Sequence, residues 1–116
     1  MVEKRSAKRS ELIHHMRVFN HDTHAFLGNL GNISEKGMML YMESPILVGE
    51  DFSLRMDFPE IFDNIQSVFF HARSIWNKQG ENETVYQGGF ELLDCSETML
   101  TLIQRAIAYY QDTPQD

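Results

Sequence analysis

The chain has a single cysteine, Cys95, among its 116 residues. One cysteine excludes an internal disulfide, and its segment LLDCSE has no second cysteine or histidine at metal-ligand spacing. Because no general base can be assigned to Cys95, we interpret it as a small buried apolar residue and not as a nucleophile.

The sequence also lacks long apolar segments. A membrane-spanning helix needs about 18 consecutive apolar residues, and no apolar segment of the sequence approaches that length. The N-terminal segment MVEKRSAKRSEL is charged where a secretory signal would have its apolar core. Hydrophobic residues make up 42% of the chain and charged residues 23%, which is typical of a globular domain. We therefore expect one soluble, cytoplasmic domain that does not insert into membranes.

Positive charge is scarce outside the N-terminal segment. The formal net charge is −7. Residues 1–17 carry five basic and two acidic side chains, a charge of +3, whereas the other 99 residues carry five basic and fifteen acidic ones, a charge of −10. Such an acidic body repels the phosphates of an extended nucleic acid, so we predict no DNA or RNA partner. A small anion held by the basic segment is still compatible with this distribution.

The middle of the chain has the pattern of short strands. Runs rich in β-branched and aromatic residues are separated by turn-forming residues. In the run FSLRMDF, Phe52, Leu54, Met56 and Phe58 alternate with polar residues, which predicts one buried and one solvent-facing side. Short strands with tight connections predict a mainly β fold, a six-stranded antiparallel barrel. The expected strands are residues 12–19, 24–34, 37–43, 51–58, 66–77 and 83–93.

A helix is expected at the C-terminal end. Ser96 is a favourable N-cap and Glu97 a favourable first-turn acid. Apolar side chains then recur at helical spacing, at Leu100, Ile103, Ile107 and Tyr110. We divide the chain into a flexible basic arm (1–11), a barrel with its C-terminal helix (12–111) and a tail (112–116).

The segment NISEKG, residues 32–37, combines polar and conformationally special residues between two expected strands. Asn32 offers a donor and an acceptor, Ser34 a hydroxyl, and Gly37 the freedom to adopt positive φ. The pattern predicts a small recognition loop at one rim of the barrel. The alternative is an ordinary β-turn with Asn32 and Gly37 in left-handed conformations.

The basic segment contains RSAKR, with Arg5 and Arg9 four positions apart, and NISEKG follows later in the chain. Together these two motifs resemble those of the PilZ family of bacterial receptors for cyclic di-GMP. The family carries Arg-x-x-x-Arg near the start of the domain, which stands here as RSAKR with Arg5 and Arg9. It also carries Asp/Asn-x-Ser-x-x-Gly after the second strand, which stands here as NISEKG. The later segments HARSIWN and YQGGFELLDCSE are similar to the family's last strands, so the resemblance covers essentially the whole chain.

The resemblance implies a six-stranded barrel with a C-terminal helix that binds cyclic di-GMP without transforming it. Arg5 and Arg9 would meet phosphate or the guanine O6 and N7 atoms through planar guanidinium groups, which also stack on purines. Asn32 would meet the guanine edge, Ser34 would contact the ligand through its hydroxyl, and Gly37 would let the backbone turn. Further contacts are expected from residues with a basic side chain: Lys4, Lys8 and Arg73. Lys4 stands where family members commonly have arginine.

The expected role is that of a ligand-gated adaptor. With cyclic di-GMP bound, the protein would regulate an unidentified downstream protein with an output in motility, exopolysaccharide or biofilm control. It would need no cofactor and would be a monomer or a weak homodimer. Two other readings stay open: an interaction module of the same fold without useful ligand binding, and a small β-barrel enzyme of the flavin type. The second lacks an assembled nucleophile, base or metal set in the sequence.

Two further interpretations concern single side chains. Adjacent strand residues point to opposite faces, so His14 and His15 cannot chelate jointly, and with His21 and His24 we expect no zinc site. Trp76 is expected in the core.

Overall fold

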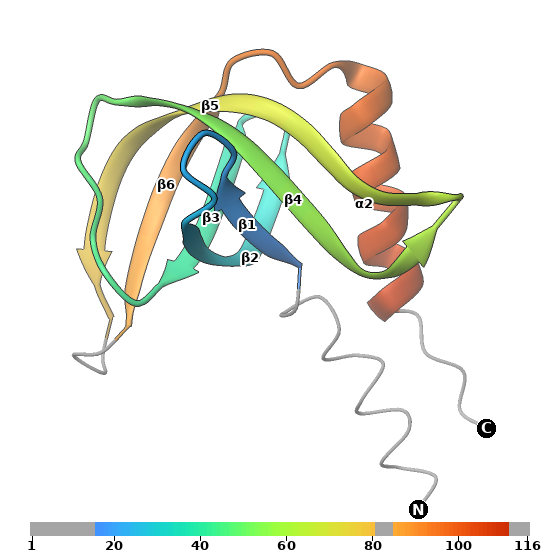
Figure 1. Cartoon of the computed structure of the whole chain (residues 1–116), viewed down its shortest axis with the longest axis horizontal. Helices are drawn as coiled ribbons and strands as arrows, with labels where there is room; N and C mark the ends of the chain where they lie inside the picture. Colours follow the sequence, from blue (N-terminus) through green and yellow to red (C-terminus); the bar gives the residue numbers. More distant parts are fainter. Residues whose placement is uncertain (1–15, 81–84, 112–116) are drawn as a thin grey trace, which may run out of the picture.

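The computed structural model describes residues 16–80 and 85–111, which form six strands followed by a helix (Figure 1). The predictions for residues 1–15, including the basic arm, lie outside the described residues, as do residues 81–84 and the tail from residue 112. The elements are β1 (Arg17–Asn20), β2 (Phe26–Ser34), β3 (Gly37–Met42), β4 (Asp51–Phe62), β5 (Ile65–Gln79), β6 (Tyr86–Leu92) and α2 (Glu97–Gln111).

The strands close into an antiparallel barrel in the order β1-β2-β3-β6-β5-β4. The predicted six-stranded antiparallel barrel with a C-terminal helix is therefore confirmed. Strand β4 continues to Phe62, four residues beyond the expected end at Phe58. The reason is a two-residue hairpin turn: Asp63 and Asn64 both have positive φ, which lets β4 reverse directly into β5.

Alternating side chains fill the barrel. On β4, Leu54, Met56 and Phe58 are buried as predicted, and Phe52 is half-buried. The outward-facing Arg55 donates from Nε to Asp57 Oδ1 at 2.9 Å. The core continues on the other elements, with fully buried side chains that include Met16, Val18, Leu30, Leu40, Met42, Ala72 and Ile103.

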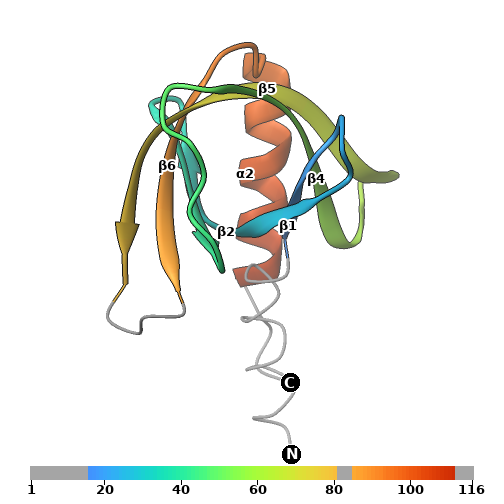
Figure 2. The same ribbon diagram turned by 60° about the vertical axis from the view of Figure 1, so that its left-hand side comes forward.

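Helix α2 packs against the barrel beside the β4–β5 hairpin (Figures 1 and 2). Ser96 caps its N-terminus as predicted, because the Ser96 hydroxyl accepts a hydrogen bond from the Met99 amide at 3.1 Å. Its apolar face is anchored by Tyr110, which is fully buried and donates its hydroxyl to the Glu60 carbonyl at 2.7 Å. Together these contacts fix both ends of the helix.

The link between β6 and α2 is fastened to β5. The Leu93 amide donates to the His71 carbonyl at 2.9 Å. The His71 amide donates to Asp94 Oδ1 at 2.6 Å, and His71 Nδ1 lies 2.6 Å from Asp94 Oδ2. The side-chain hydrogen bond from His71, followed by the one from its amide, lowers the pKa of Asp94 below its usual value. The carboxylate form of Asp94 is therefore stabilised by folding.

Replacing Asp94 by asparagine should lower the free energy of unfolding at pH 7 by less than about 1 kcal/mol, because the pair with His71 is half exposed and screened by water. A carboxylate with a lowered folded-state pKa stabilises the fold above its unfolded pKa of about 3.9 and loses this effect as pH falls through the folded pKa. The difference between the wild type and Asp94→Asn should therefore disappear in acid. Urea unfolding from pH 7 to pH 2 measures it, with Asp22→Asn as an exposed control. A difference that persists below the folded pKa would contradict this account.

Candidate functional site

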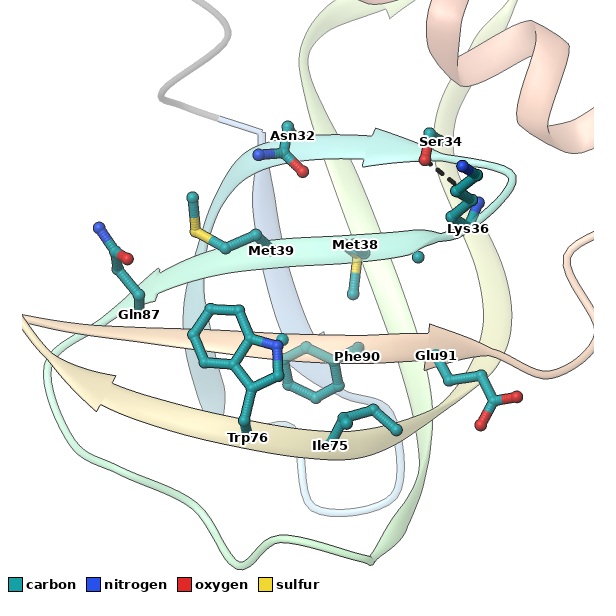
Figure 3. A pocket seen from close by; sticks show the side chains of 12 residues that line it. Asn32, Ser34, Lys36, Met38, Met39, Ile75, Trp76, Gln87, Phe90 and Glu91 are labelled. Atoms are coloured by element: carbon teal, nitrogen blue, oxygen red, sulfur yellow. Dashed lines mark hydrogen bonds between the residues drawn. The ribbon is translucent and has the colours of Figure 1, made fainter.

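A groove of about 650 Å³ runs over the outer surface of four neighbouring strands (Figure 3). It is formed where the C-terminal half of β2 lies beside β3, β6 and β5. The lining residues are Asn32, Ser34, Lys36, Gly37, Met38, Met39, Ile75, Trp76, Gln87, Gly89, Phe90 and Glu91. The structure thus brings Asn32, Ser34 and Gly37, predicted from the sequence as site residues, into one depression.

Asn32 and Ser34 lie two positions apart on β2, and both are exposed, with the buried Ile33 between them. Strand residues two apart share one face, so both side chains project toward the groove (Figure 3). The Ser34 hydroxyl accepts a hydrogen bond from the Lys36 amide at 3.1 Å. This bond holds the turn at residues 35 and 36 and leaves the hydroxyl proton available to a ligand.

The connection has the bounds that the sequence predicted. Asn32 and Ser34 belong to the end of β2 and Gly37 begins β3, so only residues 35 and 36 form the turn. The alternative of a turn with Asn32 in a left-handed conformation is wrong, because Asn32 pairs with Met39 as a strand residue and is not among the residues with positive φ.

Gly37 is required by the backbone itself. Its φ is +152°, and a Cβ atom at this position would lie 2.5 Å from the carbonyl oxygen of Phe90. Glycine therefore permits β3 to start next to β6, which forms the adjacent wall of the groove.

Trp76 is a groove residue and not a core residue, which corrects the expectation from the sequence. A bulge between Ser74 and Trp76 interrupts the alternation of β5, so both Ile75 and Trp76 face outward, with 43% and 42% of their surfaces exposed. The indole lies over Gly89 of β6, where a Cβ atom would approach the ring to 2.2 Å. The paired glycines of YQGGF are the signal that could have predicted a large side chain crossing this strand.

Arg73 lies beside the groove without lining it. Its Nε donates to Asp51 Oδ1 at 2.7 Å, and its Nη1 lies 3.9 Å from Oε1 of Glu91, a lining residue. The hydrogen bond from Arg73 lowers the pKa of Asp51. To contact a ligand in the groove, the Arg73 guanidinium would have to leave Asp51 or Glu91.

The remaining predicted contacts, Lys4, Arg5, Lys8 and Arg9, lie outside the described residues. The described chain begins at Met16, whose carbonyl accepts a hydrogen bond from the Leu30 amide at 2.9 Å. The chain thus enters the barrel beside β2, two positions from Asn32.

Among the described residues, the other reactive groups do not gather into a site. Burial raises the pKa of the Cys95 thiol, and the nearby Asp94 raises it further, which keeps the thiol protonated. Within residues 16–80 and 85–111, no three histidine, cysteine or acidic side chains are placed to hold a metal ion; His14 and His15 are not part of that range. In the same ranges no helix is long and apolar enough to cross a membrane.

Comparisons with known proteins agree on the fold. A solved structure, the PilZ domain with c-di-GMP of YcgR from Escherichia coli, superposes with a TM-score of 0.58 at 17% sequence identity. The match covers 86% of this chain and 85% of that one. No match was found among curated proteins. The sequence model of the PilZ domain matches residues 3–109, nearly the entire chain. The chain therefore belongs to the PilZ domain family.

Proposed function

We propose that this protein is a receptor for cyclic di-GMP that regulates another protein and performs no chemistry on its ligand. The observation that carries the proposal is the joint projection of Asn32 and Ser34 into a groove that also exposes the Trp76 ring. The YcgR domain of the same fold, described as a PilZ domain with c-di-GMP, supports the choice of ligand.

The groove offers chemistry suited to a guanine dinucleotide. The Asn32 amide can accept from the guanine N1 and N2 donors, and the Ser34 hydroxyl can donate to an acceptor. The exposed face of Trp76 provides a surface on which a purine can stack. Lys36 contributes positive charge toward a phosphate, so polar, stacking and charged groups converge on one ligand.

The strongest contacts in the proposal come from Arg5 and Arg9. Arginine binds phosphate or the guanine O6 and N7 atoms through two parallel hydrogen bonds. Seven residue steps separate Arg9 from Met16, which an extended chain covers in at most about 25 Å. Because Met16 is tied to β2 near Asn32, this length is enough to bring both arginines over the groove. Lys4, Lys8 and Arg73 are secondary candidates for phosphate contacts.

Ordering of the basic arm by the ligand is the proposed signal. A dianionic ligand would attract the arm, residues 1–11, to the groove at the cost of its conformational freedom. The rearranged surface would then be recognised by a downstream protein that controls motility, exopolysaccharide or biofilm formation. This places the protein in the cytoplasm, where the nucleotide would be sensed.

Titration with cyclic di-GMP should release or absorb heat and should change the fluorescence of Trp76, the one tryptophan of the chain. Stacking of a guanine on the exposed indole alters the surroundings of the indole, so the heat and the fluorescence change should give the same dissociation constant. Trp76→Phe should abolish the optical signal and keep a measurable heat of binding. Cyclic di-AMP is the matched control ligand, because adenine lacks the O6 acceptor and the N1 and N2 donors of guanine.

The same titration separates the competing functions. No heat and no fluorescence change with cyclic di-GMP would reject the receptor and favour an interaction module without a ligand. If the protein is mixed with flavin and still carries flavin absorbance after gel filtration, the result would instead favour the flavin-type enzyme.

A further inference from the structure

A row of aromatic side chains and an arginine crosses the outside of four strands, away from the groove. In register, Phe26 of β2 pairs with Phe19 of β1, Phe19 with Arg55 of β4, and Arg55 with Phe69 of β5. Residues directly opposite on one face lie close enough for their side chains to touch. We call Phe19, Phe26, Arg55 and Phe69 the aromatic ladder.

The ladder is ordered by contacts among Phe19, Phe26 and Arg55 and by the His21 ring, which lies 4.9 Å from that of Phe69, but it is open to solvent. The rings of Phe19 and Phe26 lie 5.5 Å apart, and the Arg55 guanidinium carbon lies 4.3 Å from the Phe19 ring centroid. Arg17 adds a second cation, 5.0 Å from the ring of Phe26. Even so, Phe26 and Phe69 expose 39% and 49% of their surfaces. Exposed aromatic rings that carry cations are typical of protein interfaces.

The connection between β3 and β4, residues 43–50, carries exposed aliphatic and acidic side chains, whereas the ladder carries aromatic and basic ones. Leu47 and Val48 expose 72% and 54% of their surfaces. Two exposed acids, Glu43 and Glu50, flank them, and neither forms an ion pair with another residue that the structure describes. The segment therefore presents aliphatic side chains between two negative charges.

This connection is held in place before any partner arrives. The Gly49 amide donates to the Ser74 carbonyl at 2.6 Å, and the Ser74 amide donates to the Glu50 carbonyl at 2.9 Å. Asn77 donates its side-chain amide to the Ile46 carbonyl at 2.5 Å. Such bonds lower the entropy lost on binding. They also tie the connection to β5 residues 74 and 77, so it cannot fold onto the ladder of its own chain.

We propose that two copies of this chain associate reciprocally, with the 43–50 connection of each copy on the aromatic ladder of the other. The match is both apolar and electrostatic, because Leu47 and Val48 would meet phenylalanine rings while Glu43 and Glu50 would meet Arg17 and Arg55. The Arg55 guanidinium would then be shared between the partner's glutamate and Asp57, to which it is already bonded.

Both surfaces belong to one region of the molecule. The connection leads directly into β4 (Figures 1 and 2). Five residue steps of about 3.3 Å each separate Glu50 from Arg55. A two-fold axis between two copies can therefore form both contacts at once, as an isologous dimer requires. The groove on β2, β3, β6 and β5 contributes none of the ladder or connection residues.

Sedimentation velocity over a range of protein concentrations tests the proposal. The wild type should show a monomer–dimer equilibrium. Phe69→Ser removes a ladder ring, and Leu47→Ser/Val48→Ser removes the aliphatic pair, so each should raise the dimer dissociation constant at least about tenfold. Both substitutions lie at exposed positions, and circular dichroism verifies the fold. Ile61→Ser, at an aliphatic position 64% exposed in the β4–β5 hairpin, is the matched control and should leave the equilibrium unchanged.

A mixing experiment tests the reciprocity. An equimolar mixture of the Phe69→Ser and Leu47→Ser/Val48→Ser proteins retains one intact pair of surfaces in the mixed dimer. That mixed dimer should therefore form more strongly than the dimer of either variant alone. A wild type that stays monomeric at every concentration, a dimer unaffected by both variants, or a mixture no stronger than its components would overturn the proposal. These results do not involve cyclic di-GMP and are independent of the proposed receptor function.

Discussion

Replacing Arg5 and Arg9 together by alanine should weaken the binding of cyclic di-GMP by about a hundredfold or more. Each bidentate arginine contact contributes about 1–3 kcal/mol, and each 1.4 kcal/mol corresponds to a tenfold change in the dissociation constant. Calorimetric titration of the wild type and the double variant measures the loss. Thermal unfolding of both proteins verifies that the barrel is intact in the variant.

Two matched variants separate specific contacts from general attraction. Arg5→Lys/Arg9→Lys keeps the positive charge but loses the planar fork, so its affinity should lie between those of the wild type and the alanine variant. Arg105→Ala removes an arginine that sits on α2, 3.7 Å from Asp63 and away from the groove, and should bind normally. Equal affinity in the double alanine variant would reject the assignment of the site to these arginines.

Gly37→Ala should destabilise the fold by roughly 2–3 kcal/mol, because it combines an unfavourable backbone conformation with a steric conflict. The φ of +152° is one that residues with a Cβ rarely adopt, and the new methyl group would lie 2.5 Å from the Phe90 carbonyl oxygen. That oxygen belongs to the backbone of β6 and cannot rotate away. Urea denaturation followed by circular dichroism gives the free energy of unfolding.

Gly49→Ala is the matched control for this substitution. Gly49 also has positive φ, at +90°, but a Cβ atom there would have no neighbour within 4 Å. Its replacement therefore reports the backbone cost alone, and the larger loss in Gly37→Ala reports the contact with β6. Equal losses at the two positions would show that the approach of β3 to β6 has no energetic importance.

The barrel could be predicted because its inward-facing positions alternate regularly. On β4 the buried Leu54, Met56 and Phe58 follow the two-residue period of a strand, and Ser96 marks the helix start by its side chain. The end of β4 could not be predicted in this way, because Pro59 and Glu60 interrupt the pattern. The strand continues there only because the turn at Asp63 and Asn64 brings β5 alongside.

The candidate site was predicted where its residues form a contiguous motif, and missed where it depends on pairing between distant strands. Asn32, Ser34 and Gly37 lie within six residues of sequence and share the groove. Trp76 enters the same groove because of a bulge on β5 and a glycine on β6, and the alternation of β5 alone would bury it. Whether such a side chain faces the core or the groove depends on the register between strands, which cannot be read directly from the sequence.

Closure of the barrel limits how any other molecule can recognise this protein. Each strand from β1 to β6 has a hydrogen-bonded neighbour on both sides. Among the described residues no strand lies at an open edge of the sheet, so a peptide finds no edge strand to which it could pair along its length. Inhibitors designed as strand mimics should consequently fail against this barrel, whereas compounds that compete for its outward-facing side chains have a surface to bind.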